Sequence, residues 1–288
     1  MYPTSDPRGA LSPTGDHAAG AVPAASFLEF GGRPPSEVSS GLTTWFARSR
    51  DLFIAYSIAD AATTLPALTE TGEHVALVFD AEFELDGQRG VDDSFVSIPA
   101  PTAIALGAPA RVLRLFTSVP DELASRALNS ADFSTPIADV PSAPVTSADG
   151  LVRIRSLAVP PVDGRFGRIF SSARLMVNVM YPTMGPRSSD ELSPHSHSDF
   201  EQCSISLEGD FVHHLRWPWN HRLTDWRDDL HQTVSSPSLA AIPAGVIHTS
   251  PAVGEGTHLL IDAFTPPRAD FAAMPGWVLN ATDLTESE

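Results

Sequence analysis

Two short segments in the second half of the chain hold its most specific pattern, PHSHSDFEQCSISLEG (194–209) and PAGVIH (243–248). Histidines two residues apart on an extended chain point to the same face, so His195 and His197 can reach one ion. Glu201 lies four residues after His197 with the same parity, and His248 begins another strand directly after a Pro-x-Gly turn. Three neutral imidazoles and one carboxylate suit Fe, Mn, Ni, Cu or Zn. We therefore expect these four side chains to hold one ion, with its other positions open to water or substrate.

The first half of the chain repeats the pattern of the second. Placing Pro66 over Pro194 also brings Glu73 over Glu201, at an offset of 128 residues. Later anchors, such as Pro99 over Pro243, raise the offset to 144 residues. Ordered anchors at a nearly fixed period indicate a duplicated unit. The second copy must then carry an insertion of about 16 residues, which we place in RWPWNHRLTDWRDDLHQTVSSPS (216–238).

Short strands dominate the predicted secondary structure of both halves. Brief β-branched and aromatic runs are separated by Gly, Pro or Asp, and 26 prolines and 19 glycines leave little room for long helices. One short helix is expected over 121–129. The sequence therefore predicts an all-β barrel or sandwich that occurs twice.

The two segments resemble the signature motifs of the cupin superfamily. All four metal positions match that pattern, although the spacing from Glu201 to Gly209 is one residue longer than usual and the usual downstream Asn is absent. The resemblance implies two jelly-roll (double-stranded β-helix) barrels, a bicupin, with a divalent transition metal inside the second. Fe(II) is favoured, and Mn, Ni, Zn or Cu are alternatives.

These patterns give a domain organisation. We expect a flexible N-terminal segment over 1–40, a degenerate barrel over 41–130, a linker over 131–150, a metal-binding barrel over 151–275 and a C-terminal tail over 276–288. The first barrel is degenerate because Ala67, Thr69 and Ile104 stand where the second has histidines. Glu73 alone survives, and we read it as a solvated or locally paired strand end.

Six residues are candidates for substrate binding in the second barrel. The run ARLMVNVMY alternates, so either the face of Arg174 and Asn178 or the face of Tyr181 meets the cavity. His213 and His214 follow the Gly209 turn, where parity is lost; His213 is the candidate. Arg216 and Trp219 belong to the insertion, which either walls the pocket or contacts the first barrel or a second subunit. The full set is Arg174, Asn178, Tyr181, His213, Arg216 and Trp219.

Composition excludes several other functions. A net charge of −17 repels phosphate backbones and anionic membranes, so we expect neither nucleic acid nor membrane as a partner. The single cysteine, Cys203, excludes an internal disulfide framework, and its parity with Glu201 predicts a buried core position inside the barrel. With no signal peptide or apolar run of about 20 residues, the expected location is the cytoplasm. A homodimer is a further expectation.

Two classes of function remain. The resemblance to cupins implies a metal-dependent enzyme acting on a small acidic or phenolic substrate, with a non-heme dioxygenase favoured. A lyase, isomerase or hydrolase using the metal as a Lewis acid is the alternative. The second class is a non-catalytic module that binds a small molecule or resembles storage cupins. No catalytic residue is assigned from the sequence.

Overall fold

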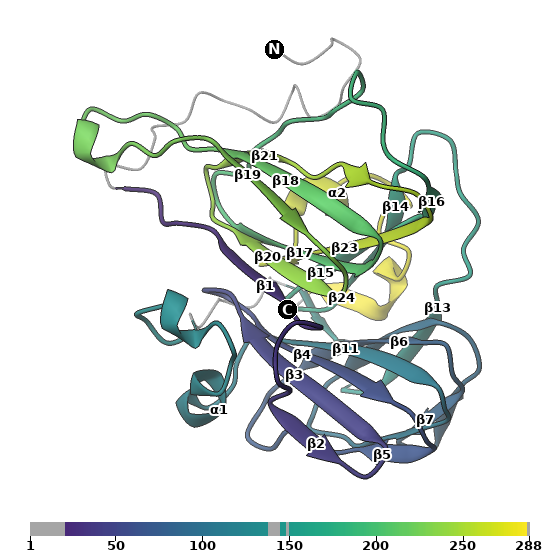
Figure 1. Cartoon of the computed structure of the whole chain (residues 1–288). Coiled ribbons are helices and arrows are strands. Elements are labelled where there is room, and N and C mark those ends of the chain that lie inside the picture. Colours follow the sequence, from purple (N-terminus) through teal and green to yellow (C-terminus); the bar gives the residue numbers. More distant parts are fainter. Residues whose placement is uncertain (1–20, 138–144, 148–149, 287–288) are drawn as a thin grey trace.

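Two β-barrels stacked on one another make up the chain (Figure 1). The computed structural model describes residues 21–137, 145–147 and 150–286. The N-terminal part of the expected flexible segment, residues 1–20, lies outside the described residues, as do 138–144 and 148–149 of the expected linker and 287–288 of the expected tail.

The first barrel consists of a seven-stranded and a four-stranded antiparallel sheet. The larger sheet has the order β13 (Arg153–Ser156), β9 (Ser94–Ile98), β6 (His74–Phe79), β11 (Ala110–Phe116), β4 (Phe53–Ala59), β3 (Leu42–Arg48) and β2 (Glu37–Ser39). The smaller has the order β5 (Thr63–Leu65), β10 (Ile104–Leu106), β7 (Phe83–Leu85) and β8 (Gln88–Gly90).

The second barrel repeats this arrangement. Its larger sheet has the order β1 (Ser26–Glu29), β20 (Ser238–Ile242), β17 (Glu201–Glu208), β23 (Thr257–Thr265), β15 (Met176–Met180) and β14 (Gly167–Ser171), with β16 (Thr183–Met184) beside β23. The smaller sheet contains β19 (Leu230–Val234), β18 (Asp210–Arg216), β21 (Ile247–Thr249) and β22 (Ala252–Val253). A separate pair joins β12 (Val145–Ser147) to β24 (Leu284–Glu286).

The matching strand orders confirm the all-β fold and explain the sequence repeat. Strands β9, β6 and β11 occupy the same successive places in the first sheet as β20, β17 and β23 in the second. The hairpin loop between β7 and β8 is short, whereas β18 and β19 are joined by a long excursion over residues 217–229. The predicted insertion is this longer hairpin.

Each larger sheet includes one edge strand that lies, in sequence, beyond the other barrel or next to it. Strand β1 pairs with β20 of the second barrel, and β13 pairs with β9 of the first. The expected boundaries therefore differ from the structure in several places, and β2 and β12 also lie in the expected flexible segment and linker. Residues 26–29, which we assigned to a flexible segment, form a sheet edge, and residues 153–156, which we assigned to the second barrel, complete the first. The expected tail likewise contains ordered structure.

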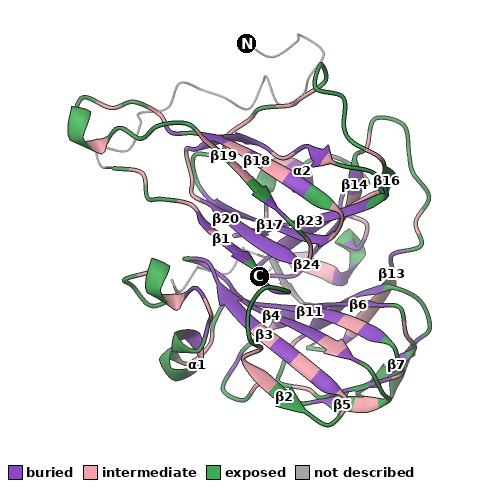
Figure 2. Cartoon of the chain, viewed as in Figure 1, coloured by how far each residue is buried: buried purple, intermediate pink, exposed green. Residues whose placement is uncertain are grey.

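The main hydrophobic core lies between the two larger sheets, where purple strands face one another in Figure 2. One cluster of buried side chains includes Leu77 and Leu113 from the first barrel and Val177 and Ile205 from the second. A second cluster of buried apolar side chains lies inside the first barrel. Alternate residues of each central strand therefore face either the shared core or the interior of their own barrel.

Helices are short and lie at the periphery. They are α1 (Asp121–Ser125), α2 (Ala269–Ala272) and the 3-10 turns η2 (Ser130–Asp132), η3 (Leu223–Asp225) and η4 (Ala281–Asp283). The helix expected over 121–129 is thus shorter than predicted. None of the helices in the described ranges has the length and apolar character needed to span a bilayer.

Candidate metal centre

Three histidines from the two signature segments meet inside the second barrel. Ligand-type nitrogens of His195, His197 and His248 all lie within 4.8 Å of one another. The backbones of His195 and His248 are joined by a pair of hydrogen bonds, with N···O distances of 3.0 and 2.8 Å. Gly245, at φ 84°, makes the turn before His248, and its N–H donates to the carbonyl of His197. The Pro-x-Gly turn thus brings the two segments into contact.

Hydrogen bonds to carbonyl oxygens fix two of the imidazoles. Nδ1 of His195 lies 2.9 Å from the Ser193 carbonyl, and Nδ1 of His248 lies 2.9 Å from the Val246 carbonyl. A carbonyl oxygen only accepts, so each Nδ1 carries the proton and each Nε2 presents a lone pair. Nε2 of His248 is buried and has no hydrogen-bond partner. Metal-binding histidines are oriented in this way.

The buried imidazoles stay neutral across the physiological pH range. Burial, followed by the influence of His195, lowers the pKa of His248 to about 3. Burial, followed by His195 and Arg268, lowers the pKa of His197 to about 2. Neutral imidazole is the form that binds a metal, so the site needs no proton release from these two rings.

Gln202 lies beside one of the three imidazoles, that of His197. Its Oε1 accepts a hydrogen bond from Nε2–H of His197 at 3.1 Å, while its Nε2 donates to Ser204 Oγ at 3.0 Å and to Asp262 Oδ1 at 3.1 Å. The two acceptors fix the amide so that its oxygen faces the imidazoles. A bound ion would replace this hydrogen bond, because two ligand atoms at about 2.1 Å and about 90° from one ion are also separated by about 3 Å.

Glu201 does not join the histidines, which corrects the predicted ligand set. It is 6% exposed, and its Oε1 accepts a hydrogen bond from the Arg50 backbone N–H at 3.0 Å in the β3–β4 turn of the first barrel. Glu73 makes the reciprocal contact and accepts from the Ala173 N–H at 2.9 Å in the β14–β15 turn of the second barrel. The two aligned glutamates therefore link the barrels, and Glu73 is paired across the interface rather than locally.

The spacing from Glu201 to Gly209, one residue longer than in the cupin pattern, is the sequence signal that Glu201 is displaced. Between His197 and β17 the chain leaves the extended conformation, so parity counted from the histidines is lost before Glu201. On β17, Cys203, Ile205 and Leu207 face the shared core, and Glu201 has their parity. Gln202 has the opposite parity and stands at the usual spacing to Gly209. Cys203 is buried as expected, but between the barrels rather than inside one.

Comparison of the sequence with family models and with curated proteins finds no match. Comparison of the structure with solved structures does. The chain is similar to Lactobacillus farciminis oxalate decarboxylase in a formate complex, with a TM-score of 0.58 at 11% identity over 84% of this chain and 86% of that one. It is also similar to vicilin from Capsicum annuum, with a TM-score of 0.58 at 10% identity over 84% and 86% of the two chains. AerE from Microcystis aeruginosa matches with a TM-score of 0.52 at 11% identity over 85% and 98%.

These solved structures share one architecture. The chain has a cupin fold. Both barrels take part in the match, because the alignments cover more than four fifths of the chain. The predicted bicupin architecture agrees with the two matching sheets of the structure.

Two of the predicted substrate-binding residues point into the second cupin barrel. Asn178 is 1% exposed, and its Oδ1 has no hydrogen-bond partner. His213 is fully buried, with Nδ1 2.8 Å from Ser250 Oγ and an unpartnered Nε2. Burial, followed by His214, lowers the pKa of His213 to about 4. His214 has the opposite parity and pairs with His231 on the outside of the hairpin.

The other four candidates lie elsewhere. Tyr181 directly follows β15, and its hydroxyl donates to the Pro160 carbonyl at 3.1 Å. Arg216 is paired with Asp229 on the outer face, and Trp219 is 68% exposed and stacked on Trp226 at 4.3 Å. Arg174 occupies the β14–β15 turn, where its carbonyl accepts from Thr265 Oγ1. Tyr181, Arg216 and Trp219 therefore lie outside the interior of the second barrel, contrary to their prediction as substrate-binding residues.

Arg268 is a residue that the sequence prediction missed. It is 7% exposed, and its guanidinium lies 5.2 Å from the ring of Phe264 and 5.6 Å from the ring of Phe200. Phe200 in turn stacks on His197 at 4.5 Å. Arg268 also pairs with Asp270 at 2.6 Å. Its sequence context, TPPRAD, carries no motif, so only the three-dimensional structure reveals a cation beside the histidines.

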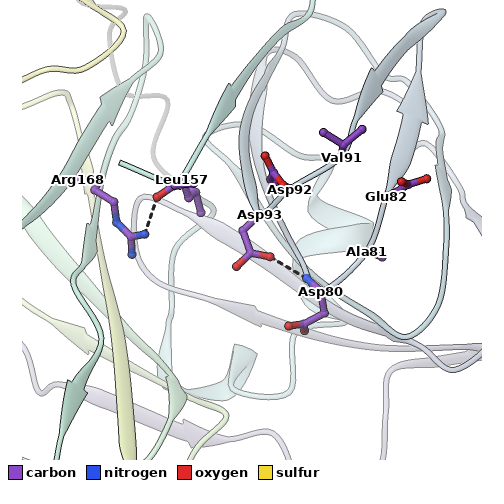
Figure 3. A pocket seen from close by; sticks show the side chains of 9 residues that line it. Asp80, Ala81, Glu82, Val91, Asp92, Asp93, Leu157 and Arg168 are labelled. Carbon is purple, nitrogen blue, oxygen red and sulfur yellow. Dashed lines mark hydrogen bonds between the residues drawn. The ribbon is translucent and has the colours of Figure 1, made fainter. Parts of the chain in front are cut away.

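A separate surface pocket of about 510 Å³ lies in the first barrel beside the 157–168 connection (Figure 3). It is lined by Asp80, Glu82, Asp92, Asp93 and Arg168, among others. Asp93 accepts from the Asp80 N–H, and Arg168 donates to the Leu157 carbonyl. The pocket contains none of the converging histidines, so its chemistry gives no reason to assign it the active site.

Proposed function

We propose that this protein is a metal-dependent enzyme that acts on a small organic acid inside the second cupin barrel. The observation that carries the proposal is the convergence of three neutral imidazoles, His195, His197 and His248, with Gln202 beside them. Such a set fits a divalent transition metal. Two of these rings are held by backbone carbonyls, which prepares the site for an ion.

The surrounding residues divide the remaining tasks. A bound divalent ion would supply positive charge and open positions for water or substrate. Arg268 supports recognition of an acid, because its guanidinium, although paired with Asp270, lies close enough to lower the pKa of His197 and His248. Asn178 and His213 offer buried polar atoms without partners, which suit hydrogen bonding to the polar end of a substrate.

Two reaction classes compete for this site. We favour oxidation by dioxygen, because the histidine-rich set suits Fe(II). The displaced Glu201 favours a second candidate, a lyase, isomerase or hydrolase. A ligand set of three imidazoles and one amide carries no negative charge, so a divalent ion there keeps its full charge and acts as a strong Lewis acid. Mn(II) or Zn(II) suits that chemistry equally well.

Turnover measurements separate these classes. The purified protein is incubated with small carboxylic, β-dicarbonyl and phenolic acids, in air and without oxygen, while oxygen uptake and products are followed. The variants are His197→Ala and, as a matched control, His221→Ala, whose side chain is exposed on the 217–229 hairpin. We expect turnover by the wild type and His221→Ala, and a loss of at least about 100-fold in His197→Ala.

The oxygen dependence then decides between the two reactions. Uptake stoichiometric with product supports an oxygenase, and equal turnover without oxygen supports Lewis-acid chemistry. Equal activity of His197→Ala and the wild type would contradict the metal-dependent site. Tight binding of an acid without turnover would show a non-catalytic binding protein and would overturn the enzyme proposal.

A further inference from the structure

A charged side chain lies in the interior of the first barrel. Arg114, on β11, is 2% exposed. It shares its parity with Val112 and Phe116, which belong to clusters inside this barrel, whereas Leu113 and Leu115 face the shared core. The Arg114 guanidinium is therefore directed into the first barrel, away from the second.

Among the residues that the structure describes, Arg114 makes one side-chain hydrogen bond. Nη1 donates to the Pro66 carbonyl at 2.8 Å, and Nε is buried without a partner. Within the described ranges no carboxylate forms an ion pair with Arg114, and Glu37, the acid whose charge it feels, pairs with Arg126. Burial lowers the pKa of Arg114 to about 10, so the group remains charged at neutral pH. The guanidinium also lies 5.7 Å from the centre of the Phe116 ring, a weaker partner than an anion. A buried cation without a carboxylate partner is costly unless an anion accompanies it.

The position of Arg114 corresponds to the metal centre of the second barrel. The repeat places His74 over Gln202, which contacts His197, and Arg114 over Asp262, which binds Gln202. The Pro66 carbonyl aligns with Pro194, directly before His195. His74 stacks on Phe116 at 4.5 Å, and the charge of Arg114 contributes to lowering its pKa. Strands β6 and β11 run side by side in the lower barrel of Figure 1.

We infer that the interior of the first barrel binds a small monocarboxylate at Arg114, at the place where the second barrel holds its histidines. Nε of the planar guanidinium fork has no partner among the described residues, and the fork matches the two oxygens of a carboxylate. His74 is neutral at neutral pH, so Arg114 is the positive charge to which the acid would bind. The neighbouring strand β6 presents apolar side chains, with Ala76 opposite Arg114 and Val78 two residues further on. We therefore expect a ligand with a short carbon chain.

The test measures binding of acetate to full-length protein in which the metal centre has been removed. All variants carry His197→Ala, so an acid bound at the metal centre does not contribute and the result is independent of the proposed enzyme. Arg114→Met removes the charge and keeps similar length. Arg89→Met is the matched control, because Arg89 belongs to the same barrel and its side chain is 64% exposed.

We expect a saturable rise in melting temperature, by about 5 °C when acetate is about 100 times its Kd, in the His197→Ala protein and in its Arg89→Met derivative. The rise should be absent in the Arg114→Met derivative. Equal responses in all three proteins, no response in any, or the same response to chloride at equal ionic strength would overturn the inference.

A conservative variant covers the case in which Arg114→Met does not fold. Arg114→Lys keeps the charge but loses the fork, so we expect acetate affinity to fall at least about 10-fold. Line broadening of carbon-13-labelled acetate in NMR reads this affinity directly. An acetate affinity unchanged by Arg114→Lys would contradict bidentate binding at Arg114.

Discussion

Gln202 and Glu201 are neighbours in sequence but belong to different parts of the molecule. Gln202 contacts His197 and is held by Ser204 and Asp262, whereas Glu201 faces the first barrel and binds the Arg50 N–H. Burial between the barrels raises the pKa of Glu201 to about 7. The amide is therefore the side chain that we assign to the ion.

A pair of single substitutions tests this assignment. Gln202→Leu removes the amide oxygen, so we expect metal affinity to fall about 10–100-fold. Glu201→Gln keeps the acceptor for the Arg50 N–H, so metal affinity should stay at the wild-type level. Both affinities are measured by competition with a chromophoric chelator. The reverse order of effects would restore Glu201 as the ligand.

His74 makes the first barrel sensitive to acid. Burial lowers its folded-state pKa from 6.5 to about 4. Between pH 6.5 and about 4, His74 is protonated in the unfolded chain but neutral in the folded protein. The free energy of unfolding therefore falls as the pH drops through this range, and the effect levels off below about pH 4. At about 1.4 kcal/mol for each pH unit, the loss due to His74 is about 3 kcal/mol.

Urea titrations of His74→Gln at a series of pH values check this contribution. Between pH 7 and pH 4 the variant should lose about 3 kcal/mol less unfolding free energy than the wild type. His221→Gln, at an exposed position, serves as the control and should follow the wild type. Parallel curves for His74→Gln and wild type would show that protonation of His74 does not limit acid stability.

At the level of elements, the exchange of edge strands ties the two barrels together. Strand β1 comes before the first barrel in sequence but closes the edge of the second-barrel sheet at β20. Leu28 of β1 is 3% exposed and packs in the shared core. The second barrel is therefore incomplete without residues from the N-terminal side of the chain.

Leu28→Ala should lower the unfolding free energy by about 2–5 kcal/mol, because it opens a cavity in the shared core. Val38→Ala is the matched control, since Val38 is 69% exposed on β2, and it should change stability by less than about 0.5 kcal/mol. Chemical denaturation measures both. Similar, small effects of the two substitutions would indicate that β1 is not packed as described.

The sequence predicted the strands better than the direction in which individual side chains point. Proline and glycine spacing predicted short strands, and the repeat predicted two copies with an insertion that the structure places in the β18–β19 hairpin. Parity holds only within one strand, so it failed across the loop after His197 and misassigned Glu201. The partners of β1, the reciprocal contacts of Glu73 and Glu201, and the position of Arg268 depend on tertiary packing, which local sequence patterns do not encode.

On the scale of the whole molecule, two barrels of one topology hold different interiors. The second directs His195, His197 and His248 inward, and the first has Ala67, Thr69 and Ile104 at the aligned positions. The common framework is kept by the shared core between the sheets, which makes no use of those positions. One ion for each chain is therefore the expected stoichiometry.

Anomalous X-ray diffraction from crystals of the metal-loaded protein, recorded at the absorption edge of the bound metal, tests this central claim most directly. We predict one peak for each chain, inside the second barrel, at about 2.0–2.3 Å from the three histidine nitrogens and the Gln202 oxygen. Glu201 should remain on the Arg50 N–H. A peak bound to the Glu201 carboxylate, a peak in the first barrel, or no peak at the three histidines would contradict the account.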